Sequence, residues 1–221
     1  MRRLKNIFQK KSLTYIFGEI LLIFVGITLA IWFNNWNTSS TARENMDLAL
    51  ERLQGEVENN LDQIGDGLAN YEFLSGAYVA FGKIYTEDSN TAVATPEHFN
   101  RLMDSFPRYF RLRDSVILDD GKVKYLGNTY INLDLPNLTE IAWDTSKSIG
   151  ITNEFSYECL YSLESTYILQ RRVENEINKA SDALQNQDIE ALMEILEFLK
   201  QLGDLLEGQY AELLDQLEDC K

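Results

Sequence analysis

Few side chains in this sequence could carry out covalent or acid–base chemistry. His98 is the single histidine of the 221 residues, and Cys159 and Cys220 are the two cysteines. A catalytic triad could therefore use only His98, and neither a histidine-rich nor a Cys-x-x-Cys metal site can be drawn. The sequence also lacks nucleophile motifs, phosphate-binding glycine loops and clusters of metal ligands. We therefore predict no catalytic residue, no metal, no cofactor and no enzyme activity.

Glu19 has the most unusual setting of the acidic residues, because it lies in the apolar stretch 15–33, YIFGEILLIFVGITLAIWF. Nineteen helical residues cover roughly 28 Å, which matches the hydrocarbon core of a bilayer. The stretch therefore predicts a membrane-spanning helix. An ionisable group at this depth is costly, so Glu19 is a candidate for helix assembly, for reaching toward lipid headgroups, or for an ion or proton role.

The flanks of the apolar stretch predict its orientation. Five basic residues and no acidic one precede it, whereas Trp32 and Trp36 mark its far end as an aromatic belt. We expect 1–12 to be a basic cytoplasmic leader, 13–36 the transmembrane helix and 37–221 an extracytoplasmic helical domain. The localisation is then the bacterial inner membrane with a periplasmic C-terminal domain. A cleaved signal peptide is the alternative, which the long apolar core disfavours.

The span also carries small residues at helical spacing. Gly26 and Ala30 form a small-x-x-x-small pair, and Gly18 lies two turns before Gly26. Such a face lets two helices approach closely. We therefore predict membrane-helix association through Gly18, Glu19, Gly26 and Ala30.

The same segment carries a family resemblance, through Gly18, Glu19, Ile20, Gly26, Ile27, Leu29, Ala30, Asn34, Trp36 and Asn37. After a short basic leader, this pattern resembles the N-terminal signature of a family of uncharacterised single-pass bacterial membrane proteins, common in Bacteroidota and catalogued as a domain of unknown function. Residues 143–150, WDTSKSIG, carry a second similarity. The resemblance covers under half of the chain. It implies a membrane anchor and an outward helical domain, and no enzyme activity.

Charge is unevenly divided along the chain. Residues 37–221 hold 15 basic and 34 acidic side chains, a net charge of −19. A domain this acidic is repelled by nucleic acid, so we predict no nucleic-acid partner. The expected partners are the lipid bilayer and either further copies of this chain or another envelope membrane protein.

Apolar periodicity predicts the elements of the outward domain. Heptad-spaced apolar residues over 43–85 predict a long amphipathic helix, interrupted midway by Asn60 and Gly67. Thr95, a capping residue before Pro96, predicts a short helix ending before Pro107, after a loop over 86–94. Further helices are expected over 137–148, closed by Gly150, over 154–184 with Asn153 as its cap, and from Ile189 onward. The fold class is thus mainly α, a bundle of long antiparallel helices with a short irregular or β-hairpin insert.

The insert lies within 108–135, where residues 116–125 predict a hairpin that turns at Asp120-Gly121. Arg108, Arg111 and Arg113 form the basic cluster of the outward domain, interleaved with aromatic residues. They could pair with neighbouring carboxylates, or bind an anion or the acidic patch of a partner.

The two cysteines lie at comparable distances from the expected turn at Gln187. Cys159 precedes it by 28 residues and Cys220 follows it by 33, so an antiparallel pair of helices offsets them by roughly 7 Å. A disulfide is therefore feasible. Two separate thiols, or an intermolecular bridge through Cys220, are the alternatives.

Three functions remain open at this point. The first is a non-enzymatic structural, scaffold or interaction module. The second is an extracytoplasmic sensory or ligand-binding module that needs a partner for output, with Trp143, Tyr157, Tyr161 and the arginines lining a pocket. The third is a subunit of an ion- or proton-coupled membrane assembly that uses Glu19.

Overall fold

The computed structural model describes residues 2–86, 91–217 and 220, with side chains at position 15 and from 17 onward. The side chains of the basic leader, on which the predicted orientation depends, lie outside the described ones. The elements in chain order are α1 (Arg2–Gly82), β1 (Thr91–Ala94), α2 (Pro96–Ser105), β2 (Phe110–Ile117), β3 (Val123–Thr129), α3 (Ile141–Ser148), the short 3-10 helix η1 (Ile151–Glu154), α4 (Tyr157–Gln185) and α5 (Ile189–Gln216). The protein is therefore mainly helical, as predicted, and contains a small antiparallel sheet.

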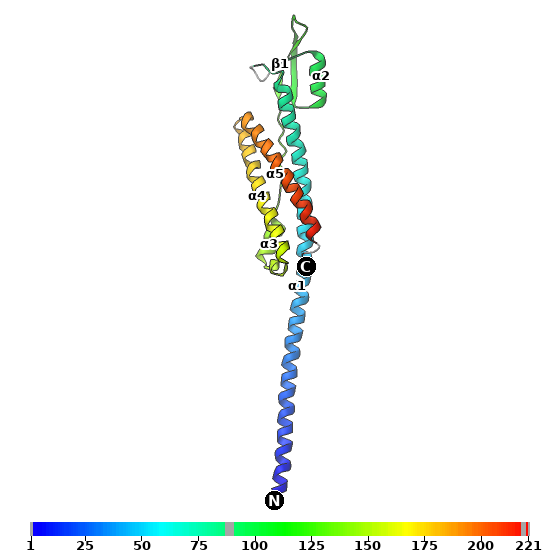
Figure 1. Ribbon diagram of the computed structural model, residues 1–221, viewed down its shortest axis with the longest axis vertical. Coiled ribbons are helices and arrows are strands. Elements are labelled where there is room, and N and C mark those ends of the chain that lie inside the picture. The colour runs from blue at the N-terminus through cyan, green and yellow to red at the C-terminus, as the bar shows by residue number, and fades with distance from the viewer. Residues whose placement is uncertain (1, 87–90, 218–219, 221) are drawn as a thin grey trace.

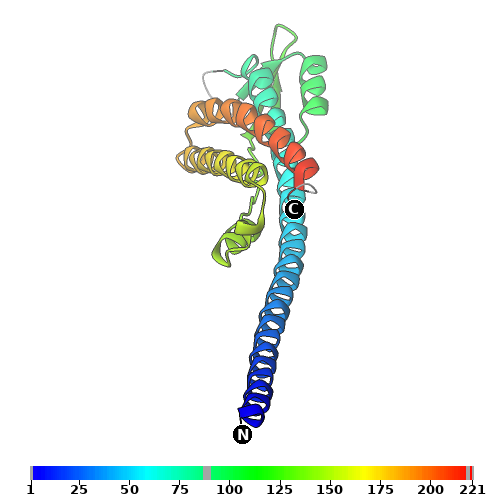
Figure 2. The same ribbon diagram turned by 60° about the horizontal axis from the view of Figure 1, so that its bottom comes forward.

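Helix α1 is the axis of the molecule. Its 81 residues form one helix about 120 Å long, in which the apolar stretch and the amphipathic stretch are continuous (Figure 1). None of the three prolines, at 96, 107 and 136, falls inside it, so every helical backbone bond can form. The N-terminal half extends alone, and the rest of the chain packs beside the other half (Figures 1 and 2).

The helical body, which we define as residues 43–82 of α1 together with α3, α4 and α5, holds most of the core. Helix α5 lies between α1 and α4 and contacts both. Most members of the predicted heptad are buried, including Leu53, Val57, Ile64, Tyr71 and Phe81. Tyr78, expected in the same stripe, is instead 36% exposed. Tyr78 lies beside Glu190 and Met193, at the start of α5. Because α5 covers only one side of α1 at this level, the Tyr78 side chain stays partly exposed.

The two interruptions of the heptad lie where another segment crosses α1. Asn60 is fully buried; its amide nitrogen donates to the backbone oxygen of Thr139 over 2.7 Å, and its amide oxygen accepts from the Thr139 N–H over 2.9 Å. A Cβ atom on Gly67 would lie 2.9 Å from Cγ of Pro136. Residues 136–139 therefore occupy the space that larger apolar side chains at these positions would fill.

The distal head, residues 83–135, carries the sheet at the end of α1 farthest from the N-terminus (Figure 1). Its strand order is β1-β3-β2, and both pairings are antiparallel. The prediction of a loop over 86–94 is wrong for Thr91–Ala94, because the β-branched Thr91 and Val93 extend along the free edge of β3. Residues 87–90 lie outside the described residues.

Four of the predicted helix boundaries can be compared with the structure. Thr95 caps α2 by accepting from the His98 N–H, and Gly150 closes α3 with a left-handed φ of 76°, so both predictions are confirmed. The start of α3 at Ile141 rather than at 137 corrects the third. Asn153 is also not the cap of α4: Ser156 is, because residues 151–154 form η1 first.

Candidate functional site

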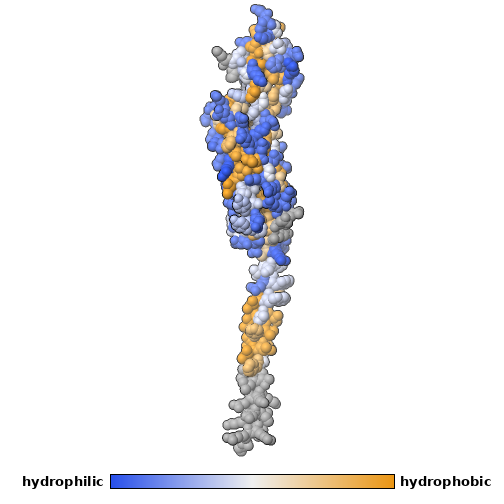
Figure 3. Space-filling model, viewed as in Figure 1, coloured by the Kyte–Doolittle hydropathy of each residue, from blue (hydrophilic) through white to orange (hydrophobic). Residues whose placement is uncertain are grey.

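The apolar stretch of α1 contacts nothing else in the described chain. Its large apolar side chains, from Phe17 to Trp36, are between 46 and 74% exposed. By length and composition this is one helix able to cross a membrane, and it lies near the N-terminus. In Figure 3 it forms the orange band on the N-terminal part of α1, which extends away from the rest of the chain. A surface of this kind in water would be strongly unfavourable, so it requires lipid or a partner.

Polar groups within the stretch differ in how they are satisfied. The Thr28 hydroxyl donates to the backbone oxygen of Phe24 over 2.8 Å, so it needs no external partner. Glu19 is exposed, with no hydrogen bond or ion pair to the rest of the described chain. Trp36, one of the two tryptophans expected at the membrane interface, packs against Phe33 with ring centroids 6.0 Å apart. A carboxyl group such as that of Glu19 must find its hydrogen-bond partner outside this chain or at the lipid surface.

Because α1 is one helix, the face of the span is fixed relative to the helical body. About 18 residues complete five turns, so residues 18 apart lie on one face. Gly26 is therefore aligned with Glu44, and Ala30 with Leu48. Glu44 is exposed, and Leu48 is 50% exposed. The small-residue face of the span is thus continuous with the solvent-exposed side of α1 beside the helical body.

The opposite face of the span aligns with the core. Met46 and Leu50, both buried against the helical body, lie 18 residues after Thr28 and Trp32. The small-residue face and the helical body are therefore on opposite sides of α1. A second helix could approach Gly26 and Ala30 without meeting α3, α4 or α5.

A buried polar network, which sequence reasoning missed, ties α1 to α3 and α4. The Glu56 carboxylate accepts hydrogen bonds from the backbone N–H groups of Ala142 and Trp143, at 2.8 and 3.3 Å, and from the Tyr167 hydroxyl at 2.7 Å. It thereby caps the N-terminus of α3, whose own residue Glu140 makes no side-chain cap. The sequence could have indicated this contact only through Glu140, which is a poor capping residue and leaves the first N–H groups of α3 without a local acceptor.

A second part of this network is centred on Gln170 of α4. Its amide oxygen accepts from the Tyr210 hydroxyl over 2.7 Å and from the Asn60 amide over 3.2 Å. Burial raises the pKa of Tyr167 and of Tyr210, and the hydrogen bond to Glu56 raises that of Tyr167 further. These hydroxyls therefore stay protonated near neutral pH and act as hydrogen-bond donors that hold the helices together.

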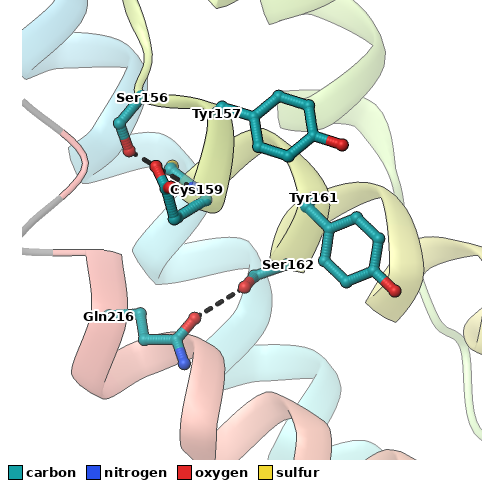
Figure 4. Close-up of a pocket in the computed structure, with 7 residues that line it drawn as sticks. Ser156, Tyr157, Cys159, Tyr161, Ser162 and Gln216 are labelled. Carbon is teal, nitrogen blue, oxygen red and sulfur yellow. Dashed lines mark hydrogen bonds between the residues drawn. The ribbon is translucent and has the colours of Figure 1, made fainter.

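The cysteines and the exposed tyrosines meet at one end of α4. Cys159 and Cys220 form a disulfide with their Cα atoms 5.2 Å apart, and the Ser156 N–H donates to the backbone oxygen of Cys220. Tyr157 and Tyr161 line a cleft of about 440 Å³ together with Cys159, and Figure 4 shows both tyrosine rings directed away from Cys159. Both are mostly exposed, at 76 and 67%.

The aromatic pocket proposed from the sequence is wrong as a single site. Trp143 is 2% exposed and stacks on Tyr167 with ring centroids 5.7 Å apart, so it points into the core and not toward the exposed tyrosines. The arginines lie in the distal head, far along α1 from Tyr157. The sequence could not show that the arginines and the exposed tyrosines lie apart, because this separation arises only when the whole chain folds.

The structure also divides the arginine cluster. Arg108 and Arg111 line one cleft of about 680 Å³ between α1 and the sheet, and Arg113 does not line it. The guanidinium carbon of Arg111 lies 3.7 Å from the ring centroid of Tyr130. Arg108 and Arg111 make no ion pair within the described chain, so the expected pairing with nearby carboxylates is not formed there.

No protein-family model, curated protein or solved structure matches this chain significantly. Among the side chains that the structure describes, no group of three or more His, Cys, Asp or Glu is placed to bind a metal ion. The resemblance to the uncharacterised single-pass family stays a prediction.

Proposed function

We propose that this chain is a non-enzymatic, single-pass membrane protein that acts as a scaffold or interaction module and assembles through its span. The observation that carries the proposal is the continuous helix α1, whose free small-residue face lies opposite the helical body. Two parallel chains could meet along Gly26 and Ala30 with both helical bodies directed outward. The span would lie in the bacterial inner membrane, with the N-terminus cytoplasmic and the helical body and distal head periplasmic.

The charge of α1 limits where such chains can touch. Glu44, Asp62 and Asp66 lie on the same face as the small residues and are exposed. Two parallel copies would bring these carboxylates toward one another, which is unfavourable. The contact is therefore confined to the membrane and to the polar residues 34–41 that follow the span, and the acidic part of α1 beyond them diverges from its counterpart. Each outward body then remains free to contact another envelope protein.

Glu19 has a defined part in this assembly. A glutamate side chain facing a second helix in lipid can form an interhelical hydrogen bond, and such bonds contribute about 1 kcal/mol. Glutamine would preserve the hydrogen bond but cannot carry a charge. The Glu19→Gln variant therefore separates an assembly role from the ion- or proton-coupled alternative.

The test measures association of the full chain in lipid vesicles, by energy transfer between labelled copies over a range of protein-to-lipid ratios. Gly26→Leu and Ala30→Leu should each lower the associated fraction, because a larger side chain separates the helix backbones. Thr28→Leu is the matched control, since it enlarges a side chain on the opposite face of the same turn. Glu19→Gln should associate like the natural chain, and Glu19→Leu less.

Two results would contradict self-assembly. One is a monomeric chain at every protein-to-lipid ratio. The other is a loss of association in Thr28→Leu as large as that in Ala30→Leu. Gentle extraction from native membranes followed by intact-mass measurement then separates the partners: a defined foreign subunit with a single copy of this chain would make it an adaptor instead.

A further inference from the structure

Among five clefts lined by described residues, the cleft between α1 and the sheet stands apart by its charge. Its lining contains Arg108 and Arg111 and no acidic side chain, whereas each of the other four contains at least one glutamate. This occurs in a protein of net charge −15. The distal head, with seven basic and eight acidic residues, is nearly neutral, so the acidic excess lies elsewhere.

Arg108 occupies a position where arginine is unfavourable. The Tyr109 N–H donates to the backbone oxygen of Phe106, Pro107 follows Phe106, and Arg108 has a φ of 75°. These are the features of a type II turn, whose third position normally takes glycine or asparagine. A long side chain held in the left-handed region is strained, and strain of this kind concentrates at functional sites. Here it places a guanidinium group at the rim of the cleft.

Arg111 is held in place by a neighbouring aromatic ring. Its guanidinium group stacks on Tyr130, while both of its hydrogen-bonding edges remain without a partner in the described chain. Two such groups can bind the oxygen atoms of one anion by charge-assisted hydrogen bonds. The ring of Phe73 on α1 also lines the cleft and offers an apolar surface. Asn132 adds an exposed amide at the rim.

We propose that this cleft binds a small organic oxyanion, with Arg108 and Arg111 holding its phosphate or carboxylate group and the aromatic rings contacting its apolar part. The volume of about 680 Å³ is in the range of small-molecule sites. Asn70, on the α1 side of the cleft, lies about 50 Å along the helix from Trp36. A lipid headgroup of the membrane that holds this chain could not reach the site. The site does not depend on self-assembly of the span.

The experiment uses isothermal titration calorimetry on the full chain in nanodiscs at constant ionic strength. Phenyl phosphate and benzoate are the probes, and benzyl alcohol is the uncharged control. We expect saturable binding of at least one anion with a Kd below about 1 mM, and none of benzyl alcohol. The tighter of the two anions identifies the natural group as phosphate or carboxylate. Binding of neither anion would overturn the proposal.

Three variants test the residues. Arg108→Gly removes the guanidinium and fits the turn, so the thermal midpoint should be equal or higher while affinity falls about tenfold or more. Arg111→Gln should weaken binding to a similar extent. Arg113→Gln removes the same charge from the neighbouring part of β2 but lies outside the cleft, so its affinity should stay within about twofold. Equal weakening in all three variants, or unchanged affinity in Arg108→Gly, would overturn the assignment.

Discussion

Glu56 on α1 and Tyr167 on α4 are joined by a hydrogen bond of 2.7 Å across 111 residues of sequence. The same carboxylate accepts hydrogen bonds from the backbone N–H groups of Ala142 and Trp143 in the first turn of α3. One side chain therefore connects three helices. Its partners Tyr167 and Trp143 are buried, so water cannot fully replace the carboxylate when it is removed.

Glu56→Ala should lower the free energy of unfolding by about 2–3 kcal/mol, because the Tyr167 hydroxyl and two backbone donors lose their acceptor. Urea unfolding followed by circular dichroism measures this. Glu58→Ala, which removes an exposed glutamate from the same helix, should cost no more than about 0.5 kcal/mol. Equal losses in the two variants would mean that the Glu56 hydrogen bonds contribute little.

Reduction of the disulfide should destabilise the helical body. Cys159 and Cys220 are 61 residues apart, and closing a loop of this length restricts the unfolded chain by about 4 kcal/mol in the chain-entropy account. Measured effects are commonly smaller, so we expect a loss of about 2–4 kcal/mol on adding dithiothreitol. The Cys159→Ala, Cys220→Ala double variant should no longer respond to reductant. Alkylation of both cysteines without prior reduction would contradict the bridge.

Alkaline pH should unfold the protein through its buried tyrosines. Burial raises the pKa of Tyr71, Tyr109, Tyr167 and Tyr210 above the ordinary value of 10.0. Below pH 10 each is protonated whether folded or unfolded, so this contribution is fully present. Above it the unfolded chain loses protons that the folded chain keeps, and stability falls by about 1.4 kcal/mol per pH unit for each tyrosine.

The measurement is urea unfolding at a series of pH values from neutral to alkaline, with tyrosinate absorbance recorded in parallel. Tyr210→Phe removes one of the four groups, so its stability should fall less steeply with pH, although it also loses the hydrogen bond to Gln170. Stability that does not change above pH 10 would contradict the prediction.

Two glycines of α5 should respond oppositely to alanine. A Cβ atom on Gly203 would lie 2.6 Å from Cδ2 of Leu68 on α1, whereas one on Gly208 would meet nothing within 4 Å. Gly203→Ala should therefore cost about 1–3 kcal/mol through overpacking. Gly208→Ala should stabilise by up to about 1 kcal/mol, because alanine is the better helix former. Thermal unfolding of the two variants side by side decides this, and a stabilised Gly203→Ala would contradict close packing of α1 and α5.

The sequence by itself determined the local features of this protein. Apolar periodicity was enough to predict the amphipathic part of α1 and the helices α4 and α5, because the side chains of one helical face repeat every three to four residues whatever lies opposite. Thr95 and Gly150 were enough to mark helix ends, because their effect acts within one turn. The two cysteines could be placed at one level by counting residues along two helices.

The tertiary structure alone decided the features that depend on distant partners. Asn60 and Gly67 look like defects in the heptad until residues 136–139 cross α1 and fill them. The cap of α3 comes from Glu56, 85 residues before the first residue of that helix. Of the three clustered arginines, Arg108 and Arg111 line one cleft and Arg113 does not. A hydrogen-bond donor or a steric gap specifies what its partner must be, but the chain segment that supplies it is fixed only when the whole chain packs.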